Sequence, residues 1–180
     1  MTKEKIVTGY PSIDKPWQCY YPENVCNMEI HTQNMYQFIY ESNKNRLNNT
    51  AILYFGRSIT YKEIFDNIKK AACAFLNMGI KKGDIVSVLS LNTPETVYAI
   101  YGLNYIGATV NLMVASITAH EVIDNITNTE SKLLMILDKV LEKYDDFVCP
   151  VPVVVVGEAD SMGCMYKAMM RSRLQSFPIL

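Results

Sequence analysis

The residues best suited to binding a metal are five cysteines and two histidines. They are Cys19, Cys26, Cys73, Cys149, Cys164, His31 and His120. Cys19, Cys26 and His31 lie near one another in the sequence, but no Cys-x-x-Cys pair occurs, and that spacing is the usual start of a zinc site. Ordinary reduced thiols are therefore the favoured interpretation, and we predict no metal site.

Acid–base catalysis is the next chemistry to consider. His120 lies in Thr118–Glu121, whose Thr-x-x-Glu pattern begins a helix, so its imidazole should be exposed. A general base needs a cleft and a buried partner, which this position does not offer. The remaining candidates are acids that fit turns, helix ends and loops, namely Asp84, Glu95, Asp124 and Asp138. None is paired at a spacing that indicates acid–base work, so we predict no catalytic residue.

Composition and charge exclude several classes of protein. At 180 residues, 49% hydrophobic and 19% charged, the chain fits one globular α/β domain with a large core. A net charge of -1 gives no electrostatic basis for binding nucleic acid. No apolar run approaches the roughly 20 residues that cross a bilayer. The N-terminus lacks the apolar core of a signal peptide. We expect a cytoplasmic protein with no membrane span and no nucleic-acid partner.

The elements that would position any site follow a repeated pattern. A threonine begins a helix, a glycine or polar turn ends it, and a short apolar run follows. The helical segments are Thr60–Gly79, Thr93–Gly107 and Thr118–Ser131, and the apolar runs are Ile85–Leu89, Ala108–Met113, Lys132–Leu137 and Val153–Val156. Helices that alternate with strands predict an α/β fold with a mostly parallel sheet flanked by helices.

Helical spacing also predicts which side chains the helices bury. The three predicted stripes are Ile64, Ile68, Ala72 and Phe75; Val97, Ile100, Tyr101 and Tyr105; and Val122, Ile123 and Ile126. Before the first helix, the run Ala51–Phe55, a Gly56-Arg57 turn and a second short run predict a small hairpin.

The two ends of the chain differ from the middle. Three prolines interrupt Met1–Asn27, which predicts an extended N-terminal arm, and Asn27–Tyr40 has helical spacing. We expect residues 1–49 to form this arm and helix, residues 50–157 the α/β subdomain, and residues 158–180 a terminal helix or tail.

Four segments in order resemble the N-terminal part of the adenylate-forming (AMP-binding) enzymes, a superfamily that includes acyl-CoA synthetases, peptide-synthetase adenylation domains and beetle luciferases. Ile59–Ile64 matches their first core motif, an apolar residue followed by Thr/Ser-Tyr-x-Glu-Leu. Leu103–Asn111 matches the second, Leu-x-x-Gly-Ala followed by a strand. Gly79–Val86 and Asn92–Glu95 recur between them. The resemblance covers roughly Thr50 to Asp138, and Gly9–Trp17 is similar to the leader of bacterial acyl-CoA synthetase-like members.

The resemblance implies a two-step reaction for the parent enzyme, which would use ATP, Mg²⁺ and CoA. A carboxylate attacks the α-phosphate of ATP to give an acyl-adenylate, and a thiol then displaces AMP. The family performs the first step with a Ser/Thr/Gly-rich phosphate loop and a lysine, and no such loop, Gly-x-x-x-x-Gly-Lys-Ser/Thr or Gly-x-Gly-x-x-Gly motif occurs here. We therefore expect this chain to be the first third of an acyl-CoA synthetase. Alone, it should be inactive and should bind no cofactor. Its expected partners are the remaining C-terminal part of the enzyme and a carboxylic acid substrate.

One segment of the chain can be assigned a binding role by the resemblance. Val114-Ala115-Ser116 corresponds to a stretch that borders the CoA (pantetheine) tunnel in some acyl-CoA synthetases, although the usual small glycines are replaced. A plain connection between a strand and a helix is the alternative for this loop. Leu112 stands where many members have proline, which leaves the fold unchanged.

A second function from another class stays open. The chain could be a freestanding, non-catalytic α/β module for binding or assembly. If it is instead part of a larger enzyme, the face that packs against the rest would be exposed in isolation, which predicts self-association.

Overall fold

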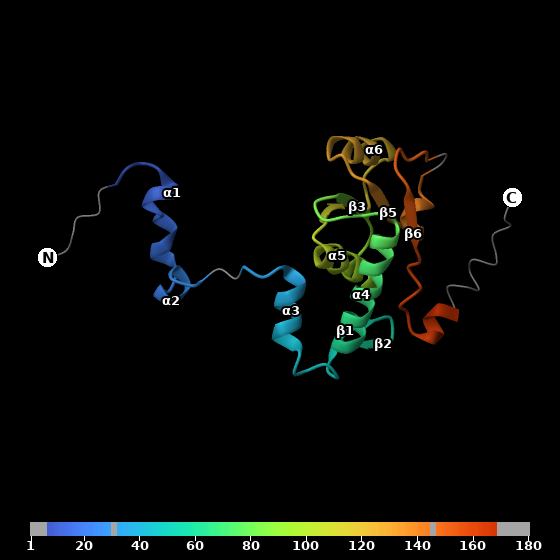
Figure 1. The fold of residues 1–180 in the computed structure, drawn as a ribbon, viewed down its shortest axis with the longest axis horizontal. Coiled ribbons are helices and arrows are strands. Elements are labelled where there is room, and N and C mark those ends of the chain that lie inside the picture. Colours follow the sequence, from blue (N-terminus) through green and yellow to red (C-terminus); the bar gives the residue numbers. More distant parts are fainter. Residues whose placement is uncertain (1–6, 30–31, 145–146, 169–180) are drawn as a thin grey trace. The chain divides into compact units, whose positions relative to one another are not determined.

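The computed structural model describes residues 7–29, 32–144 and 147–168. The chain divides into two compact units, residues 1–32 and 33–180, which Figure 1 colours from blue to red along the sequence. The two units are considered separately.

The N-terminal unit consists of short helical turns. They are α1 (Pro11–Asp14), the 3₁₀ helix η1 (Pro16–Tyr20) and α2 (Glu23–Cys26). Proline at the first position of α1 and of η1 starts these turns instead of preventing them, because a missing amide costs nothing there. The Asp14 carboxylate accepts hydrogen bonds from the backbone of Thr8 and Gly9 at 2.8–3.1 Å. Because of these turns, the backbone of the arm is not extended throughout. None of the three turns contains a buried residue, so they form no core of their own.

Helix α3 (Met35–Asn43) belongs to the second unit. The prediction that it begins near Asn27 is wrong, because Asn34 caps it: the Asn34 side chain accepts from the amide of Gln37, and Gln37 reaches back. Its buried residue is Tyr36, whose amide donates to the Asn104 side chain at 3.0 Å, whereas Phe38 is exposed. The face of α3 that packs contains Tyr36.

The predicted hairpin is present, but its turn lies one residue earlier than the predicted Gly56-Arg57 turn. Strands β1 (Thr50–Tyr54) and β2 (Arg57–Thr60) pair antiparallel. Phe55 and Gly56 form the two-residue turn with φ values of 39° and 74°, which suits the twist of an antiparallel pair.

The central sheet is parallel, as the sequence predicts. Its strands are β3 (Ile85–Leu89), β4 (Thr109–Met113), β5 (Leu133–Leu137) and β6 (Val153–Val156), in the order β4-β3-β5-β6. All five residues of β5 are buried, as expected for a parallel strand covered on both faces. The predicted α/β fold class is confirmed.

Helices cover both faces of this sheet (Figure 1). They are α4 (Tyr61–Asn77), α5 (Pro94–Ile106), α6 (Ala119–Asn128) and the short α7 (Asp138–Leu141). On one face, Phe75 of α4 and Leu103 of α5 pack with Val86, Val88 and Met135. On the other, α6 and α7 pack with the alternate strand residues, including Leu89, Leu134 and Ile136. None of the described helices is both long enough and apolar enough to cross a bilayer.

The predicted buried faces of α4 and α6 are correct in the main, and that of α5 is wrong. Ile64, Ile68, Ala72 and Phe75 are buried in α4, and Val122 and Ile126 in α6. In α5 the buried residues are Pro94, Thr96, Tyr98, Ala99, Gly102 and Leu103, and Tyr105 is exposed. The helix turns its small residues inward because it lies directly against α4, where a Cβ on Gly102 would be 3.1 Å from the backbone of Ile68 and of Ala72.

Little of the predicted terminal helix can be compared with the structure. Residues 164–168 are helical, Met162 is buried, and Met165 is exposed. Met169 and the rest of the predicted tail lie outside the described residues.

The caps predicted from Thr60, Thr93 and Thr118 are all present, and that of α4 gives a pH-dependent prediction. The Thr60 side chain accepts from the Glu63 amide at 3.2 Å, and the Glu63 carboxylate accepts from the Thr60 amide at 2.8 Å. The bond from the Thr60 amide, with that from its hydroxyl, lowers the pKa of Glu63 from 4.5. Because the folded pKa lies below the unfolded one, this stabilisation is complete above the unfolded pKa and is lost as the pH falls through the folded value.

Thr60→Ala should therefore lower the free energy of unfolding by about 1 kcal/mol at neutral pH, the usual cost of a lost cap. The loss should shrink as the pH falls, because protonation of Glu63 removes the charged acceptor of the Thr60 hydroxyl in the wild type. Urea denaturation at about pH 7 and about pH 3 measures both values. An equal loss at the two pH values would show that the bond from the Thr60 hydroxyl to the Glu63 carboxylate contributes nothing to the cap.

Candidate functional site

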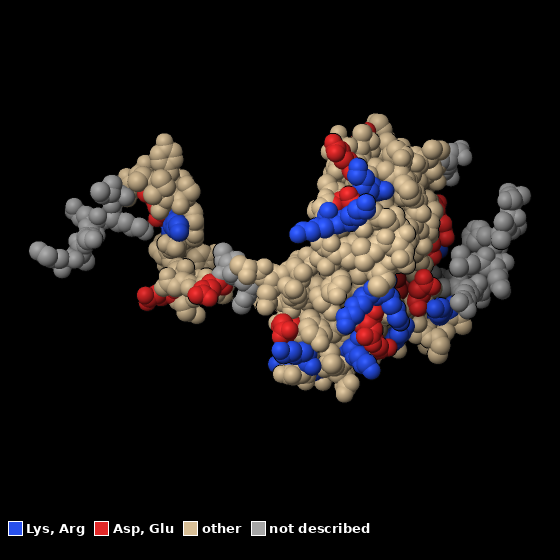
Figure 2. Space-filling model, in the orientation of Figure 1, with Lys and Arg blue, Asp and Glu red and all other residues tan. Residues whose placement is uncertain are grey.

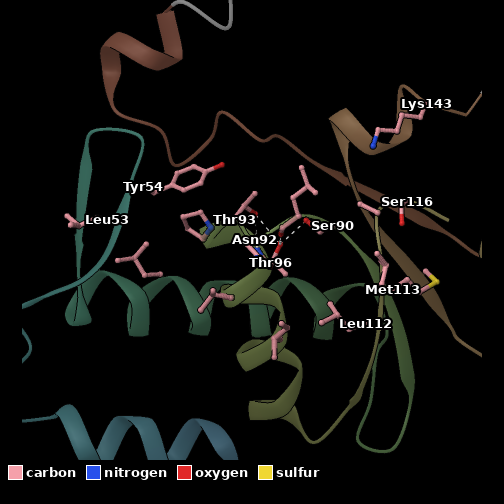
Figure 3. Close-up of a pocket in the computed structure, with 17 residues that line it drawn as sticks. Leu53, Tyr54, Ser90, Asn92, Thr93, Thr96, Leu112, Met113, Ser116 and Lys143 are labelled. Atoms are coloured by element: carbon pink, nitrogen blue, oxygen red, sulfur yellow. Dashed lines mark hydrogen bonds between the residues drawn. The ribbon is translucent and has the colours of Figure 1, made fainter.

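A cleft of the second unit lies at the carboxyl ends of β3 and β4 and has a volume of about 810 Å³ (Figure 3). Strand β1 forms one wall, the loop from β3 to α5 forms the floor, and the end of β4 with the following loop forms the far side. In open parallel sheets, ligands bind outside the carboxyl ends of the strands, so this cleft is the candidate site.

The polar floor of the cleft comes from the loop that starts α5. The Thr96 hydroxyl donates to the Leu91 carbonyl at 2.7 Å and lies 2.8 Å from the Ser90 hydroxyl. Since Thr96 has one hydroxyl proton, Ser90 must donate to it. The Thr93 side chain accepts from the Thr96 amide at 3.3 Å and caps the helix. These hydroxyls hold the loop together, and their hydrogen-bonding capacity is largely used within it (Figure 3).

The walls are mainly apolar, and Lys143 is the one charged residue of the described lining. The apolar side chains are Ile52, Leu53, Val97, Ile100, Leu112, Met113 and Val114. Figure 3 shows Lys143 on one side of the cleft and the ring of Tyr54 on the other. A cleft of this composition can hold an uncharged, partly apolar chain, and one lysine is a poor match for the charge of a triphosphate.

The structure places all three residues of the predicted site in this cleft. Val114, Ala115 and Ser116 connect β4 to α6 and line its edge. Val114 is 69% exposed and Ala115 is 8% exposed, so Ala115 anchors the loop while its neighbours remain accessible. The loop therefore has the position that a channel wall requires, and a binding role for it stays a prediction.

The titratable groups nearest the cleft are not arranged for acid–base catalysis. Burial, with the neighbouring carboxylates Glu158, Glu95 and Asp138, raises the pKa of Tyr54 to about 12. Its hydroxyl donates to the Glu158 carbonyl at 3.2 Å. Tyr54 is thus protonated at neutral pH and serves as a hydrogen-bond donor, not as a base.

The other candidates from the sequence lie away from the cleft. The side chain of His120 is 84% exposed and lies 3.6 Å from Asp124 on the surface of α6. His31 is outside the described residues. Within the described ranges, no three His, Cys, Asp or Glu side chains are grouped closely enough to hold a metal ion.

The profile of the family described as AMP-binding enzyme matches residues 39–169. The chain is 26% identical over 130 residues to a long-chain-fatty-acid–CoA ligase of Bacillus subtilis, which covers 72% of this chain and 23% of that protein. It is 33% identical over 92 residues to 4-coumarate–CoA ligase CCL1 of Humulus lupulus, covering 51% of this chain and 17% of that one. The chain thus spans about a quarter of these curated relatives or less.

Solved structures share the fold. A benzoate CoA ligase from Burkholderia xenovorans LB400 superposes with a TM-score of 0.63 at 16% identity, over 69% of this chain and 26% of that one. The anthranilate CoA ligase AuaEII in complex with anthranoyl-AMP gives 0.63 at 18% identity, over 73% and 26%. At such identities the superpositions show the fold alone, and they agree with the parallel sheet described above.

Proposed function

Because the chain belongs to the AMP-binding enzyme family, we propose that it is the N-terminal part of a CoA ligase that activates a carboxylic acid with ATP and transfers it to CoA. The observation that carries the proposal is the match over residues 39–169, which contains the whole parallel sheet and its cleft. Relatives named for long-chain fatty acids, 4-coumarate and acetate all match. The substrate is accordingly proposed only as a carboxylic acid.

The proposed role of this part is structural support and access for the thiol, not phosphate chemistry. Displacing pyrophosphate needs donors and cations placed around developing charge. The cleft does not fit that task, since its threonine and serine hydroxyls hold the loop before α5 and Lys143 is alone. ATP and Mg²⁺ would therefore be bound by the part of the enzyme that the relatives have in addition to the region matched here.

The thiol-bearing arm of CoA fits the cleft better. It is a flexible, uncharged chain of amides and methylene groups, and the lining combines apolar side chains with Ser116. We place this arm along Val114, Ala115 and Ser116, whose exposed edge could guide it. When bound, CoA supplies the thiol that accepts the acyl group. The residues of this loop would orient it and exclude water.

Reading the coding DNA beyond the codon for Leu180 tests the proposal. An open frame that continues into a Ser/Thr/Gly-rich loop followed by a lysine is the expected result. A stop codon directly after Leu180 would favour the alternative, a freestanding α/β module for binding or assembly.

Self-association is expected if the cleft normally packs against further polypeptide. Leu53 is 78% exposed and Leu112 58% exposed at its rim, and buried apolar surface contributes about 25 cal/mol per Å². Figure 2 shows, on one face of the second unit, a broad area without charged side chains between two charged groups.

Light scattering after size-exclusion chromatography should give a mass that rises above 20.5 kDa with concentration. Leu112→Glu should keep the chain monomeric, because it places a charge at the rim. Leu76→Glu adds the same charge on the exposed surface of α4, away from the cleft, and should leave association unchanged. A wild-type chain that stays monomeric at high concentration would refute the expectation.

A further inference from the structure

A second groove lies on the other side of α5, between α4 and the strands β5 and β6, with a volume of about 430 Å³. It shares no residue with the lining of the first cleft. Phe75 of α4, Met135 of β5 and Val154 of β6 form its apolar base. β6 is the last strand of the described sheet, and the α4–α5 pair leaves part of its face uncovered.

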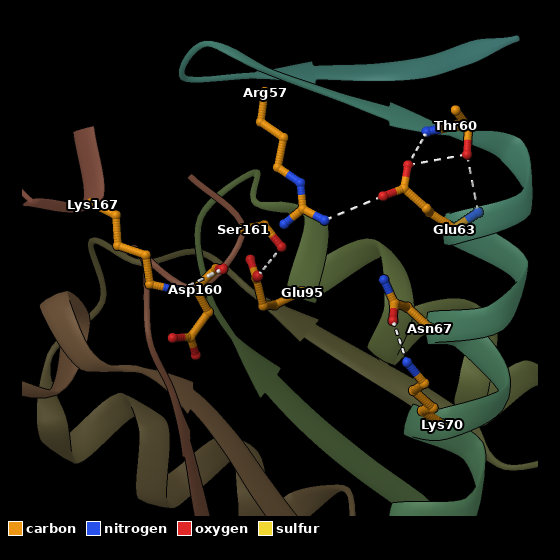
Figure 4. Close-up of polar contacts among 9 residues, drawn as sticks. All are labelled: Arg57, Thr60, Glu63, Asn67, Lys70, Glu95, Asp160, Ser161 and Lys167. Carbon is orange, nitrogen blue, oxygen red and sulfur yellow. Dashed lines mark hydrogen bonds and ion pairs between the residues drawn. The ribbon is translucent and has the colours of Figure 1, made fainter. Parts of the chain in front are cut away.

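The part of this groove that Glu95 and Tyr98 line contains two buried polar atoms with unusual surroundings. The Glu95 carboxylate accepts a hydrogen bond from the Ser161 hydroxyl through Oε1 (Figure 4). Its Oε2 and the hydroxyl of Tyr98 are shielded from solvent, and neither has a hydrogen-bonding partner in the part of the chain that the structure describes. Tyr98 is only 8% exposed. A buried polar atom without a partner costs about 1–3 kcal/mol, so two of them at one groove need an explanation.

The charges around this part of the groove favour a cation. The charged residues that line the groove are Arg57, Glu95 and Asp160. Arg57 lies 3.4 Å from Glu63 and so faces a carboxylate outside the groove (Figure 4). The other two cations in this view are also engaged: Lys167 donates to the Asp160 carbonyl at 3.1 Å, and Lys70 donates to the Asn67 side chain at 3.4 Å (Figure 4). Among the described residues, Glu95 Oε2 therefore accepts no hydrogen bond from a cation.

We propose that this groove binds a small apolar molecule that ends in a primary amine. Its ammonium group donates to Glu95 Oε2 and to the Tyr98 hydroxyl, and its hydrocarbon part lies on Phe75, Met135 and Val154. An ammonium has three donors and no acceptor, so it can donate to the Glu95 carboxylate and to the Tyr98 hydroxyl oxygen at once. The apolar base supplies the remaining affinity through buried area. The proposal rests on the groove alone and holds whether or not the chain is part of a CoA ligase.

Three probes of equal chain length separate the contributions. Hexylamine, 1-hexanol and hexanoate are titrated into the isotope-labelled chain at constant ionic strength, and chemical-shift changes report the affinity and the location. Hexylamine should bind about tenfold more tightly than 1-hexanol, as expected for one charge-assisted hydrogen bond. Hexanoate should bind most weakly. Shift changes should centre on Met135 and Val154.

Variants then assign the preference to particular atoms. Glu95→Gln keeps an oxygen for Ser161, and it should remove the preference for hexylamine while leaving 1-hexanol binding unchanged. Tyr98→Phe should weaken hexylamine binding by about threefold, a typical loss for one neutral hydrogen bond. Glu130→Gln removes the same charge at an exposed position outside both cavities and should change nothing.

Ala74→Trp offers a test that leaves the polar part intact. Ala74 is exposed and lines the groove, so the indole should block hexylamine and 1-hexanol alike. The proposal is overturned if hexylamine and 1-hexanol bind the wild-type chain equally, if shift changes avoid the groove, or if Glu130→Gln reduces the preference as much as Glu95→Gln.

Discussion

Gly102→Ala is expected to destabilise the protein, although alanine normally stabilises a helix. Without neighbours, the substitution would raise stability by about 0.5–1 kcal/mol, because glycine loses more backbone entropy on folding. Here the added Cβ would lie 3.1 Å from the Ala72 amide nitrogen and 3.1 Å from the Ile68 carbonyl oxygen. Backbone atoms inside α4 cannot move aside, so α5 must shift, and overpacking of this kind costs about 1–3 kcal/mol.

The free energy of unfolding should fall in Gly102→Ala, whereas it would rise if the position were uncrowded. Urea denaturation followed by circular dichroism measures the free energy of unfolding. Cys73→Ala is the matched control, since Cys73 is exposed on α4 beside the contact, and it should be neutral or slightly stabilising. A Gly102→Ala variant as stable as the wild type would mean that α4 and α5 do not touch as described.

The contact between α4 and α5 matters for function because α5 carries residues of both cavities. Thr93 and Thr96 at its start form the floor of the first cleft, and Glu95 and Tyr98 line the second groove. A shift of α5 should therefore alter both sites. Structural changes in Gly102 variants are expected to extend to residues of both cavities, which the new side chain does not contact.

Local signals in the sequence predict the start of the central helices well. A Thr-x-x-Glu pattern acts through hydrogen bonds between residues three apart, so Thr60 and Thr118 form their capping boxes as predicted. The strands are equally clear, because buried parallel strands are short apolar runs between turns. β6 matches its predicted range, and β5 begins one residue late.

Tertiary packing decides what the pattern leaves open. α5 is apolar nearly all round, so helical spacing gives no contrast between its faces. The pattern therefore wrongly predicts that the large residues Val97, Ile100 and Tyr105 are buried. The structure instead buries Ala99 and Gly102, because small residues let two helices approach closely. Asn34 was likewise read as part of a helix, although it is the cap.

The two cavities differ in how far the sequence could indicate them. The family resemblance predicts a binding role for Val114, Ala115 and Ser116, and these residues line the first cleft. No local sequence pattern indicates the second groove, because Glu95 and Ser161 are 66 residues apart and meet only in the folded chain. In the sequence, Glu95 is an ordinary acid at the start of a helix. Only the burial of its Oε2 atom in the folded chain distinguishes it from other such acids.

The chain alone is expected to catalyse no exchange of pyrophosphate into ATP. Forming an acyl-adenylate requires several donors and cations that hold the transferring phosphate. The sequence contains no Ser/Thr/Gly-rich phosphate loop of the family's kind, and the first cleft offers one lysine beside hydroxyls that hold its own loop. A complete enzyme exchanges pyrophosphate into ATP whenever its acid is present, because adenylate formation is reversible.

ATP–pyrophosphate exchange by the purified 180-residue chain measures adenylate formation itself. Labelled pyrophosphate, ATP and Mg²⁺ are supplied with acetate, benzoate and a long-chain fatty acid, and circular dichroism verifies that the chain is folded. The account predicts that label enters ATP no faster than in a reaction without protein. Exchange that saturates with ATP and rises in proportion to the amount of chain would contradict it.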